Sequence, residues 1–105
     1  MNIKLILTST TLLGALGMTS LTASANPQIA KANQCFACHS LDKKIIGPSY
    51  QDIAKRYKNE PGAPIKIAEH IRNGVVGVWG STPMPAKPGI SDADMNALIK
   101  WMLAQ

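Results

Sequence analysis

The strongest constraint on the fold is a five-residue motif, Cys35-Phe36-Ala37-Cys38-His39, which contains both cysteines of the chain. A C-x-x-C-H sequence is the attachment site for c-type haem. Two thiols one helical turn apart can form thioethers with the vinyl groups along one edge of the macrocycle. The next residue, His39, can then supply an imidazole nitrogen as the proximal ligand of the iron. The motif predicts a fold built around one haem, held covalently through Cys35 and Cys38.

Three other interpretations of the two cysteines are weaker. A thioredoxin-like redox site accompanies a βαβ pattern, which this sequence lacks. A zinc site needs a fourth ligand and normally a second Cys/His cluster, and only His70 remains. A structural disulfide between Cys35 and Cys38 would close a very short loop, so it would stabilise the fold little. We therefore favour haem attachment.

The first 25 residues differ in composition from the rest of the chain. Residues 1–25 contain one cation, Lys4, and no acid, proline or aromatic residue. Ala23 and Ala25 are small residues at the two positions that signal peptidase reads. We interpret residues 1–25 as a secretory signal peptide that is cleaved before Asn26. An uncleaved membrane anchor is a weaker interpretation of these residues. The apolar run is shorter than the roughly 20 residues that span a bilayer, and it contains hydroxyl residues.

Residues 26–105 are expected to form one exported, soluble domain. A chain of 80 residues buries only about 60–65% of its unfolded surface. Two cysteines cannot build a disulfide framework, so a cofactor is expected to complete the core. Ten Lys and Arg against six Asp and Glu give this segment a net charge of +4. No basic tract interleaved with aromatic residues is present, which argues against nucleic acid as a partner. A mildly basic surface suits docking to an acidic protein face.

Apolar periodicity and capping residues predict an all-α domain of three to four helices. We expect helices from Asn26-Pro27 towards Gln34, from Tyr50 to about Lys58, from about Ala63 to Asn73 and from Asp92 to Ala104. Ser49 and Ser91 are the expected N-caps of the second and last helices, and Gly74 is the expected C-cap of the third. The expected inward residues are Ile53, Ala54 and Tyr57, then Ile65, Ala68 and Ile71, and in the last helix Met95, Leu98, Ile99, Met102 and Leu103.

The 16 residues from Val75 to Ile90 contain three glycines and three prolines. This composition predicts a long irregular loop, and such loops in compact domains are usually functional. Met84 lies in this loop between Pro83 and Pro85, which stiffen the backbone around it. A thioether held in this way could ligate the haem iron at its sixth position.

Four residues could supply that sixth ligand: His70, Met84, Met95 and Met102. The spacing of Met95 and Met102 places both on the apolar face of the last helix, where core packing is the better explanation. His70 is expected on a flank of the third helix. We therefore favour Met84.

The segment Asn73-Gly74-Val75-Val76-Gly77-Val78-Trp79-Gly80-Ser81-Thr82-Pro83-Met84-Pro85 resembles the axial-methionine loop of small bacterial class I cytochromes c of the cytochrome c-551 type (the cytochrome c8 group). The similarity continues at Ile46-Gly47-Pro48 and at Leu98-Ile99-Lys100-Trp101-Met102-Leu103, so it covers essentially all of residues 26–105. It implies the class I cytochrome c fold, with three to four helices wrapped around one covalently attached haem c.

The resemblance also implies roles for individual residues. These are His39 and Met84 as axial iron ligands, Cys35 and Cys38 as thioether carriers, Pro48 as carbonyl acceptor for the His39 ring N–H, and Trp79 and His70 near a haem propionate. Trp101 would pack in the core beside the first helix. Family members often carry an asparagine that contacts the axial sulfur three residues after the methionine, and this chain has Lys87 there.

A haem with histidine and methionine on its two axial positions has no open site for oxygen or substrate, so one-electron transfer is the expected function and the protein is not an enzyme. The resemblance implies a periplasmic monomer of a respiratory chain that docks transiently with redox proteins. The donor would be of the cytochrome bc1 type, and the acceptor a terminal oxidase, nitrite reductase or peroxidase. Lys43, Lys44 and Lys87 are expected to surround the exposed haem edge.

Two other function classes remain open. A ligand-sensing haem protein would have a loosely held sixth position, which the Pro83-Met84-Pro85 sequence argues against. An exported thiol–disulfide protein would use Cys35 and Cys38 without haem.

Overall fold

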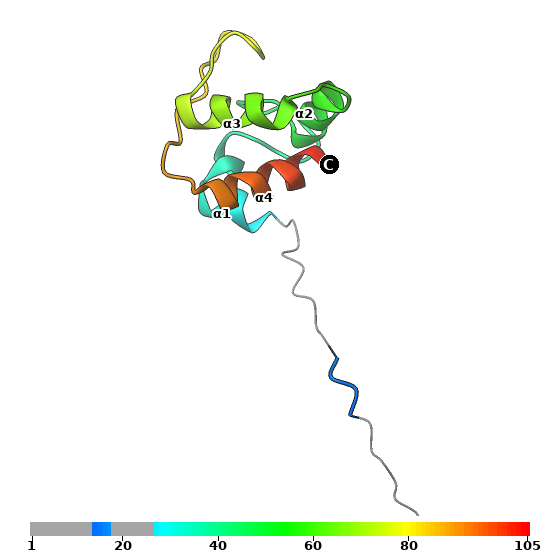
Figure 1. Cartoon of the computed structure of the whole chain (residues 1–105). Helices are drawn as coiled ribbons and strands as arrows, with labels where there is room; N and C mark the ends of the chain where they lie inside the picture. Colours follow the sequence, from blue (N-terminus) through cyan, green and yellow to red (C-terminus); the bar gives the residue numbers. More distant parts are fainter. Residues whose placement is uncertain (1–13, 18–26) are drawn as a thin grey trace, which may run out of the picture.

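The structure is a computed structural model that describes residues 14–17 and 27–105 (Figure 1). Most of the predicted signal peptide lies outside the described residues, and so do its cleavage site before Asn26 and the expected helix start at Asn26. No helix in the described part of the chain is long and apolar enough to cross a membrane.

The helical segments follow in the order α1 (Gln28–Ala32), the short 3-10 helix η1 (Cys35–Ala37), α2 (Tyr50–Tyr57), α3 (Ala63–Asn73) and α4 (Asp92–Leu103). Within residues 14–17 and 27–105 the only β pairing is one isolated antiparallel bridge, so the all-α prediction is confirmed. The first helix ends at Ala32 and does not continue to Gln34, because Gln34 takes the left-handed conformation with φ 59°.

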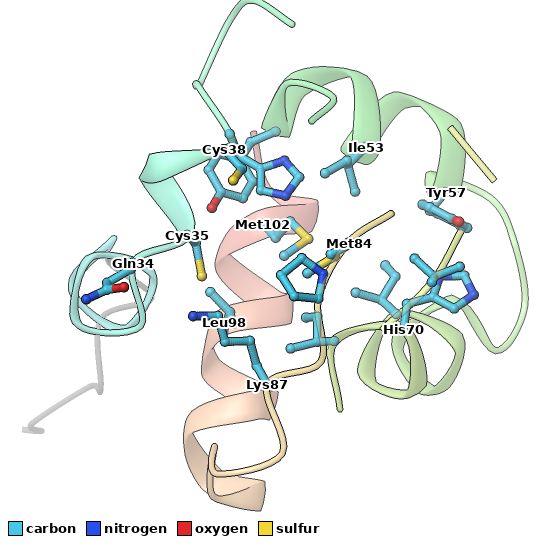
Figure 2. Close-up of a pocket in the computed structure, with 16 residues that line it drawn as sticks. Gln34, Cys35, Cys38, Ile53, Tyr57, His70, Met84, Lys87, Leu98 and Met102 are labelled. Carbon is cyan, nitrogen blue, oxygen red and sulfur yellow. The ribbon is translucent and has the colours of Figure 1, made fainter. Parts of the chain in front are cut away.

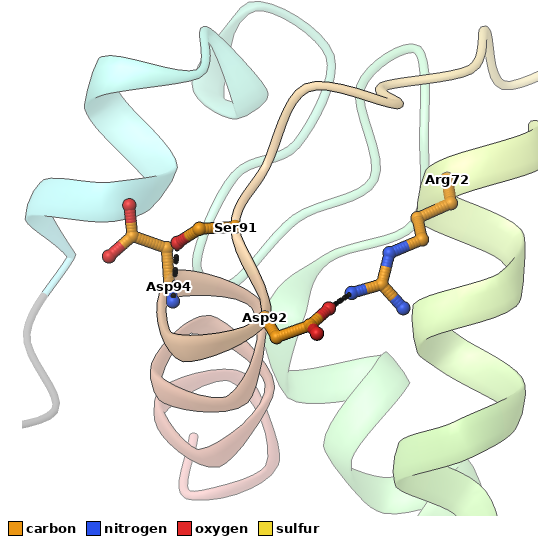
Figure 3. Close-up of polar contacts among 4 residues, drawn as sticks. All are labelled: Arg72, Ser91, Asp92 and Asp94. Atoms are coloured by element: carbon orange, nitrogen blue, oxygen red, sulfur yellow. Dashed lines mark hydrogen bonds and ion pairs between the residues drawn. The ribbon is translucent and has the colours of Figure 1, made fainter.

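Three of the predicted helix ends are set by the predicted capping residues. Ser49 Oγ accepts a hydrogen bond of 3.0 Å from the backbone N–H of Asp52 at the start of α2. Ser91 Oγ accepts one of 3.2 Å from the N–H of Asp94 at the start of α4 (Figure 3). Gly74 ends α3 with φ 76°. An ion pair between Arg72 and Asp92 joins the end of α3 to the start of α4 (Figure 3).

α4 is the central helix, because it contacts α1, α2 and α3. Its buried residues are Met95, Leu98, Ile99, Trp101 and Met102. The Trp101 ring lies 4.8 Å from that of Tyr50 and 6.1 Å from that of Phe36, measured between centroids. Trp101 therefore packs in the core, as expected.

The prediction for one core residue is wrong. Ile65 was expected to face inward, but 69% of its surface is exposed. The buried residues of α3 are Ala63, Ile67 and Ile71, which recur every four positions and so share one face. Ala68 and Leu103 are half-buried at the edge of the core.

Candidate functional site

A cleft of about 780 Å³, partly open to solvent, lies between η1, α2, α3, α4 and the segment that joins α3 to α4 (Figure 2). Most of its wall is apolar, from residues such as Ile53, Ile67 and Leu98. A second hollow lies beside it, lined by residues 75–85 and by the loop that follows His39. Cys38, His39 and Met84 line both hollows, so the predicted haem-binding residues border one continuous region.

Both cysteines of the motif line the cleft, and neither forms a disulfide. The backbone of η1 explains their shared direction. The N–H of Cys38 donates to Cys35 O at 3.2 Å, and the N–H of His39 donates to the same oxygen at 3.0 Å. Side chains three positions apart in a 3-10 helix lie one above the other. The left-handed Gln34 starts this turn directly after α1.

Burial acts on the groups beside Cys35. It raises the pKa of the Cys35 thiol, and the positive charge of Lys87 partly opposes this rise. Burial and the neighbouring Cys35 thiol also raise the pKa of Tyr50 well above its usual range. The Tyr50 hydroxyl is buried, and the Cys35 thiol is the polar side chain that acts on it. Both groups are therefore neutral at physiological pH.

The ring of His39 is held by the chain that follows it. Its Nδ1 lies 2.7 Å from the carbonyl oxygen of Pro48, which is the predicted contact. A carbonyl can only accept, so Nδ1 carries the proton and Nε2 keeps a free lone pair in the neutral imidazole. Gly47 packs against the same ring, because a Cβ there would lie 2.6 Å from His39 Cε1. The N–H of Gly47 donates to Cys38 O at 2.7 Å and so fixes this approach.

The loop that contains Met84 is more ordered than its composition predicts. Val75 and Met84 form the antiparallel bridge, with N···O distances of 3.1 Å and 2.8 Å. At the tip, the N–H of Gly77 donates to Gly80 O at 3.0 Å. Both glycines have positive φ, of 90° and 114°, which favours glycine. Residues 75–84 thus form a hairpin-like loop, and Met84 is half-buried at its base.

The other residues singled out by the sequence divide between the two hollows. His70, from α3, is half-buried in the wall of the cleft (Figure 2). Trp79 is half-buried in the second hollow. Lys87 is half-buried in the cleft wall, whereas Lys43 and Lys44 are exposed. Of the three lysines expected around the haem edge, Lys43 and Lys44 are therefore exposed as predicted and Lys87 is not.

Sequence reasoning missed the contacts of Arg56 and Tyr50. Arg56 lies over the Trp79 ring, with Cζ 4.5 Å from the ring centroid. Tyr50 lies beside both Cys35 and the His39 ring, whose centroid is 5.5 Å from its own. The sequence pattern placed Tyr50 only at the start of this helix and predicted neither its burial nor these partners.

The residues around the cleft fit a haem. Two free thiols, an imidazole with an available Nε2 and a thioether lie around a space with apolar walls, as a covalently attached macrocycle with an iron centre requires. In residues 14–17 and 27–105, no three side chains of His, Cys, Asp or Glu gather as a metal site. The zinc alternative therefore lacks a ligand set in this part of the chain.

Comparisons with known proteins agree with this arrangement. The family model described as cytochrome c matches residues 24–105. Cytochrome c-552 of Nitrosomonas europaea is 43% identical over 81 residues, which are 77% of this chain and 79% of that protein. Cytochrome c-551 of Pseudomonas aeruginosa is 41% identical over 81 residues, which are 76% of this chain and 77% of that protein.

Solved structures show the same fold. The crystal structure of Nitrosomonas europaea cytochrome c552 matches with a TM-score of 0.72 and 42% identity, covering 75% of this chain and 98% of that one. A class 1 cytochrome from Sideroxydans lithotrophicus matches with a TM-score of 0.64 and 27% identity, covering 76% and 91%. The predicted fold is confirmed by these matches. The chain belongs to the cytochrome c family, as a small class I member that carries one covalently attached haem c.

Proposed function

We propose that this cytochrome c is a periplasmic one-electron carrier of a respiratory chain, with His39 and Met84 as the axial ligands of its haem iron. The haem supplies the one-electron chemistry of its iron when bound. The observation that carries the proposal is that separate segments of the chain bring Cys35, Cys38, His39 and Met84 to one apolar region.

The residues around the cleft have distinct tasks in this proposal. Cys35 and Cys38 form the thioether links. The bond from His39 Nδ1 to Pro48 O fixes the ring plane and makes the imidazole a more basic ligand. The antiparallel bridge of Val75 holds the backbone of Met84. If His39 and Met84 both hold the iron, oxygen or a substrate would have no open coordination site.

Residues 1–25 are the export signal in this proposal, and residues 26–105 are the mature cytochrome c domain. His70 lines the cleft and Trp79 lines the second hollow, and both would lie near the haem propionates when haem is bound. The proposed partners are redox proteins that dock transiently with this monomer. A cytochrome bc1-type complex would be the donor, and a terminal oxidase, nitrite reductase or peroxidase the acceptor.

The ligand assignment is tested with Met84→Ala in the holoprotein. The variant is expected to keep its covalent haem, to lose the thioether absorption band at the red end of the oxidised spectrum and to bind carbon monoxide rapidly when reduced. Met102→Leu is the matched control, because Met102 also lines the cleft but is buried on α4. It is expected to keep the band and to exclude carbon monoxide like the parent.

Two results would contradict the proposal. If Met102→Leu, and not Met84→Ala, opens the sixth position, the ligand is misassigned. If the parent itself binds carbon monoxide rapidly, the ligand-sensing alternative becomes the better explanation.

A further inference from the structure

Helix α2 connects the two segments that contain the proposed axial ligands. Its first turn is tied to the residues after His39, because the N–H of Tyr50 donates to Ser40 O at 2.9 Å and that of Gln51 to Leu41 O at 3.1 Å. Pro48, which accepts from the His39 ring, lies two residues before the helix begins. The other end of α2 reaches the hairpin-like loop of residues 75–84 through Arg56.

Arg56 makes two contacts with the tip of that loop. Its Nη1 donates a hydrogen bond of 2.8 Å to the carbonyl oxygen of Val78, which is 22 residues further along the chain. Its Cζ lies 4.5 Å from the centroid of the Trp79 ring and 5.8 Å from that of Tyr57. A hydrogen bond from a charged donor is stronger than a neutral one, and a guanidinium is attracted to the faces of aromatic rings.

These contacts are the polar link between the loop tip and a helix. Among the hydrogen bonds and ion pairs of the described residues, only that of Arg56 joins residues 76–83 to a helix. In the same part of the chain Arg56 has no carboxylate partner, since the ion pairs there are Lys66–Glu60 and Arg72–Asp92. Apart from its contact with the neighbouring Tyr57 ring, the guanidinium therefore interacts with the loop.

The loop can transmit this restraint to Met84. Val78 and Trp79 lie between Gly77 and Gly80, whose hydrogen bond closes the tip. The two legs of the loop meet again at the bridge between Val75 and Met84. Gly74, just before that bridge, approaches so closely that a Cβ there would lie 2.8 Å from Met84 O. A movement of the tip away from α2 would tilt the whole loop and with it the Met84 side chain.

We propose that Arg56 is a positioning residue, whose contacts with Val78 and Trp79 hold the loop so that the Met84 thioether stays at the sixth coordination position. This inference rests on the proposed function, in which Met84 is the axial ligand. Arginine suits the task better than lysine, because its planar fork can donate to a carbonyl while its face stacks on a ring.

The test measures how fast imidazole displaces Met84 from the oxidised holoprotein. At saturating imidazole the exchange rate is limited by dissociation of the thioether, which a loosened loop accelerates. Arg56→Gln is expected to raise this rate about tenfold, since it removes the stacked charge and the charged donor. Arg56→Lys keeps the charge but loses the planar guanidinium. Its exchange rate is expected to lie between those of the parent and Arg56→Gln. Both variants are expected to keep the thioether band.

Two control variants separate positioning from other effects. Lys55→Gln removes the same charge from the neighbouring exposed residue of α2 and is expected to exchange within about twofold of the parent. Ile99→Val removes a methyl group from a buried residue of α4 and lowers the melting temperature without touching the loop. Its exchange rate at a temperature well below melting is expected to match that of the parent.

Failure of this inference can be told apart from failure of the proposed function. If Met84→Ala keeps the thioether band, the ligand assignment is wrong and the role of Arg56 is refuted with it. If Met84→Ala loses the band but Arg56→Gln exchanges no faster than Lys55→Gln, only the role of Arg56 is refuted. Equal acceleration by Ile99→Val and Arg56→Gln would also overturn it, because exchange would then follow global stability.

Discussion

The His39 ring is restrained on two sides by consecutive residues. Pro48 accepts the Nδ1 hydrogen at 2.7 Å, and Gly47 leaves the space that the ring occupies. The backbone of Gly47 does not have a positive φ, so the requirement for glycine here is one of space and not of backbone conformation. The absence of a side chain at Gly47 is thus part of how the ring is oriented.

Gly47→Ala is expected to disturb this arrangement, because the new Cβ would lie 2.6 Å from Cε1 and 2.9 Å from Nδ1 of His39. The loss of stability should be about 1–3 kcal/mol, as for other overpacked sites. The midpoint potential should rise, since an imidazole that loses its carbonyl partner is less basic and stabilises the oxidised iron less. Chemical denaturation and redox titration of the holoprotein would measure both effects.

The control for this prediction is Gly89→Ala. An added Cβ at Gly89 meets nothing within 4 Å, and its φ is ordinary, so its stability should change by no more than about 0.5 kcal/mol. Equal behaviour of the two variants would show that the contact at Gly47 is unimportant.

At the scale of elements, the two serine caps differ in their surroundings. Ser49 is 1% exposed and begins α2, whereas Ser91 is exposed at the start of α4 (Figure 3). Water can replace a lost cap at an exposed helix end but reaches a buried one poorly. The cap of α2 should therefore contribute more to stability than the cap of α4.

Ser49→Ala removes the acceptor for the Asp52 N–H and is expected to cost about 1–2 kcal/mol. In a domain of this size that corresponds to a fall in melting temperature of roughly 4–16 °C. Ser91→Ala, as the matched variant, should cost about 0.5–1 kcal/mol. Thermal unfolding of the two holoproteins checks the order, and a larger loss for Ser91→Ala would contradict it.

Local sequence signals were sufficient for most helix ends, because caps such as Ser49 and Gly74 act within one turn of the chain. They were insufficient for the face of α3, where Ile65 and Ile67 are equally apolar and only tertiary packing places Ile67 in the core. The pairing of Val75 with Met84 and the contact of Arg56 with Trp79 were not predicted either. Both contacts join distant residues, and no periodicity encodes them.

The candidate site follows the same division. The C-x-x-C-H spacing predicted Cys35, Cys38 and His39 as haem-binding residues, because the chemistry is contained in one turn. Whether Met84 lies near this motif depends on the tertiary fold. Local reasoning could therefore only favour Met84 as the sixth ligand, and the family resemblance implied the same residue. The position of Lys87 in the sequence was not enough to predict its exposure. Its backbone N–H donates to Ile71 O at 2.7 Å, and its side chain lies against the cleft and not on the outer surface.

At the scale of the whole molecule, exposed apolar and basic residues occur together near the second hollow. Ile46 and Val76 are 58% and 63% exposed. Both line that hollow with Lys44, and Lys43 is exposed next to it. Residues 26–105, the proposed mature domain, have a net charge of +4, so their field attracts anions generally. Only cations close to the haem edge should direct an anionic electron acceptor to the point of transfer.

The last prediction tests that local steering with ferricyanide, an anionic oxidant that takes one electron from the reduced holoprotein. In the double variant Lys43→Gln, Lys44→Gln the second-order rate constant at low ionic strength is expected to fall about two- to fivefold, because two nearby attractive charges are lost. The control is Lys58→Gln, Lys100→Gln, which removes the same net charge from exposed residues that line neither hollow. The control rate should stay closer to that of the parent. Added salt should make the rate constants of the parent and the two double variants converge, since the Debye length falls to about 3 Å at 1 M. Equal losses in the two double variants at low salt would show that net charge alone, and not the position of Lys43 and Lys44, governs the encounter.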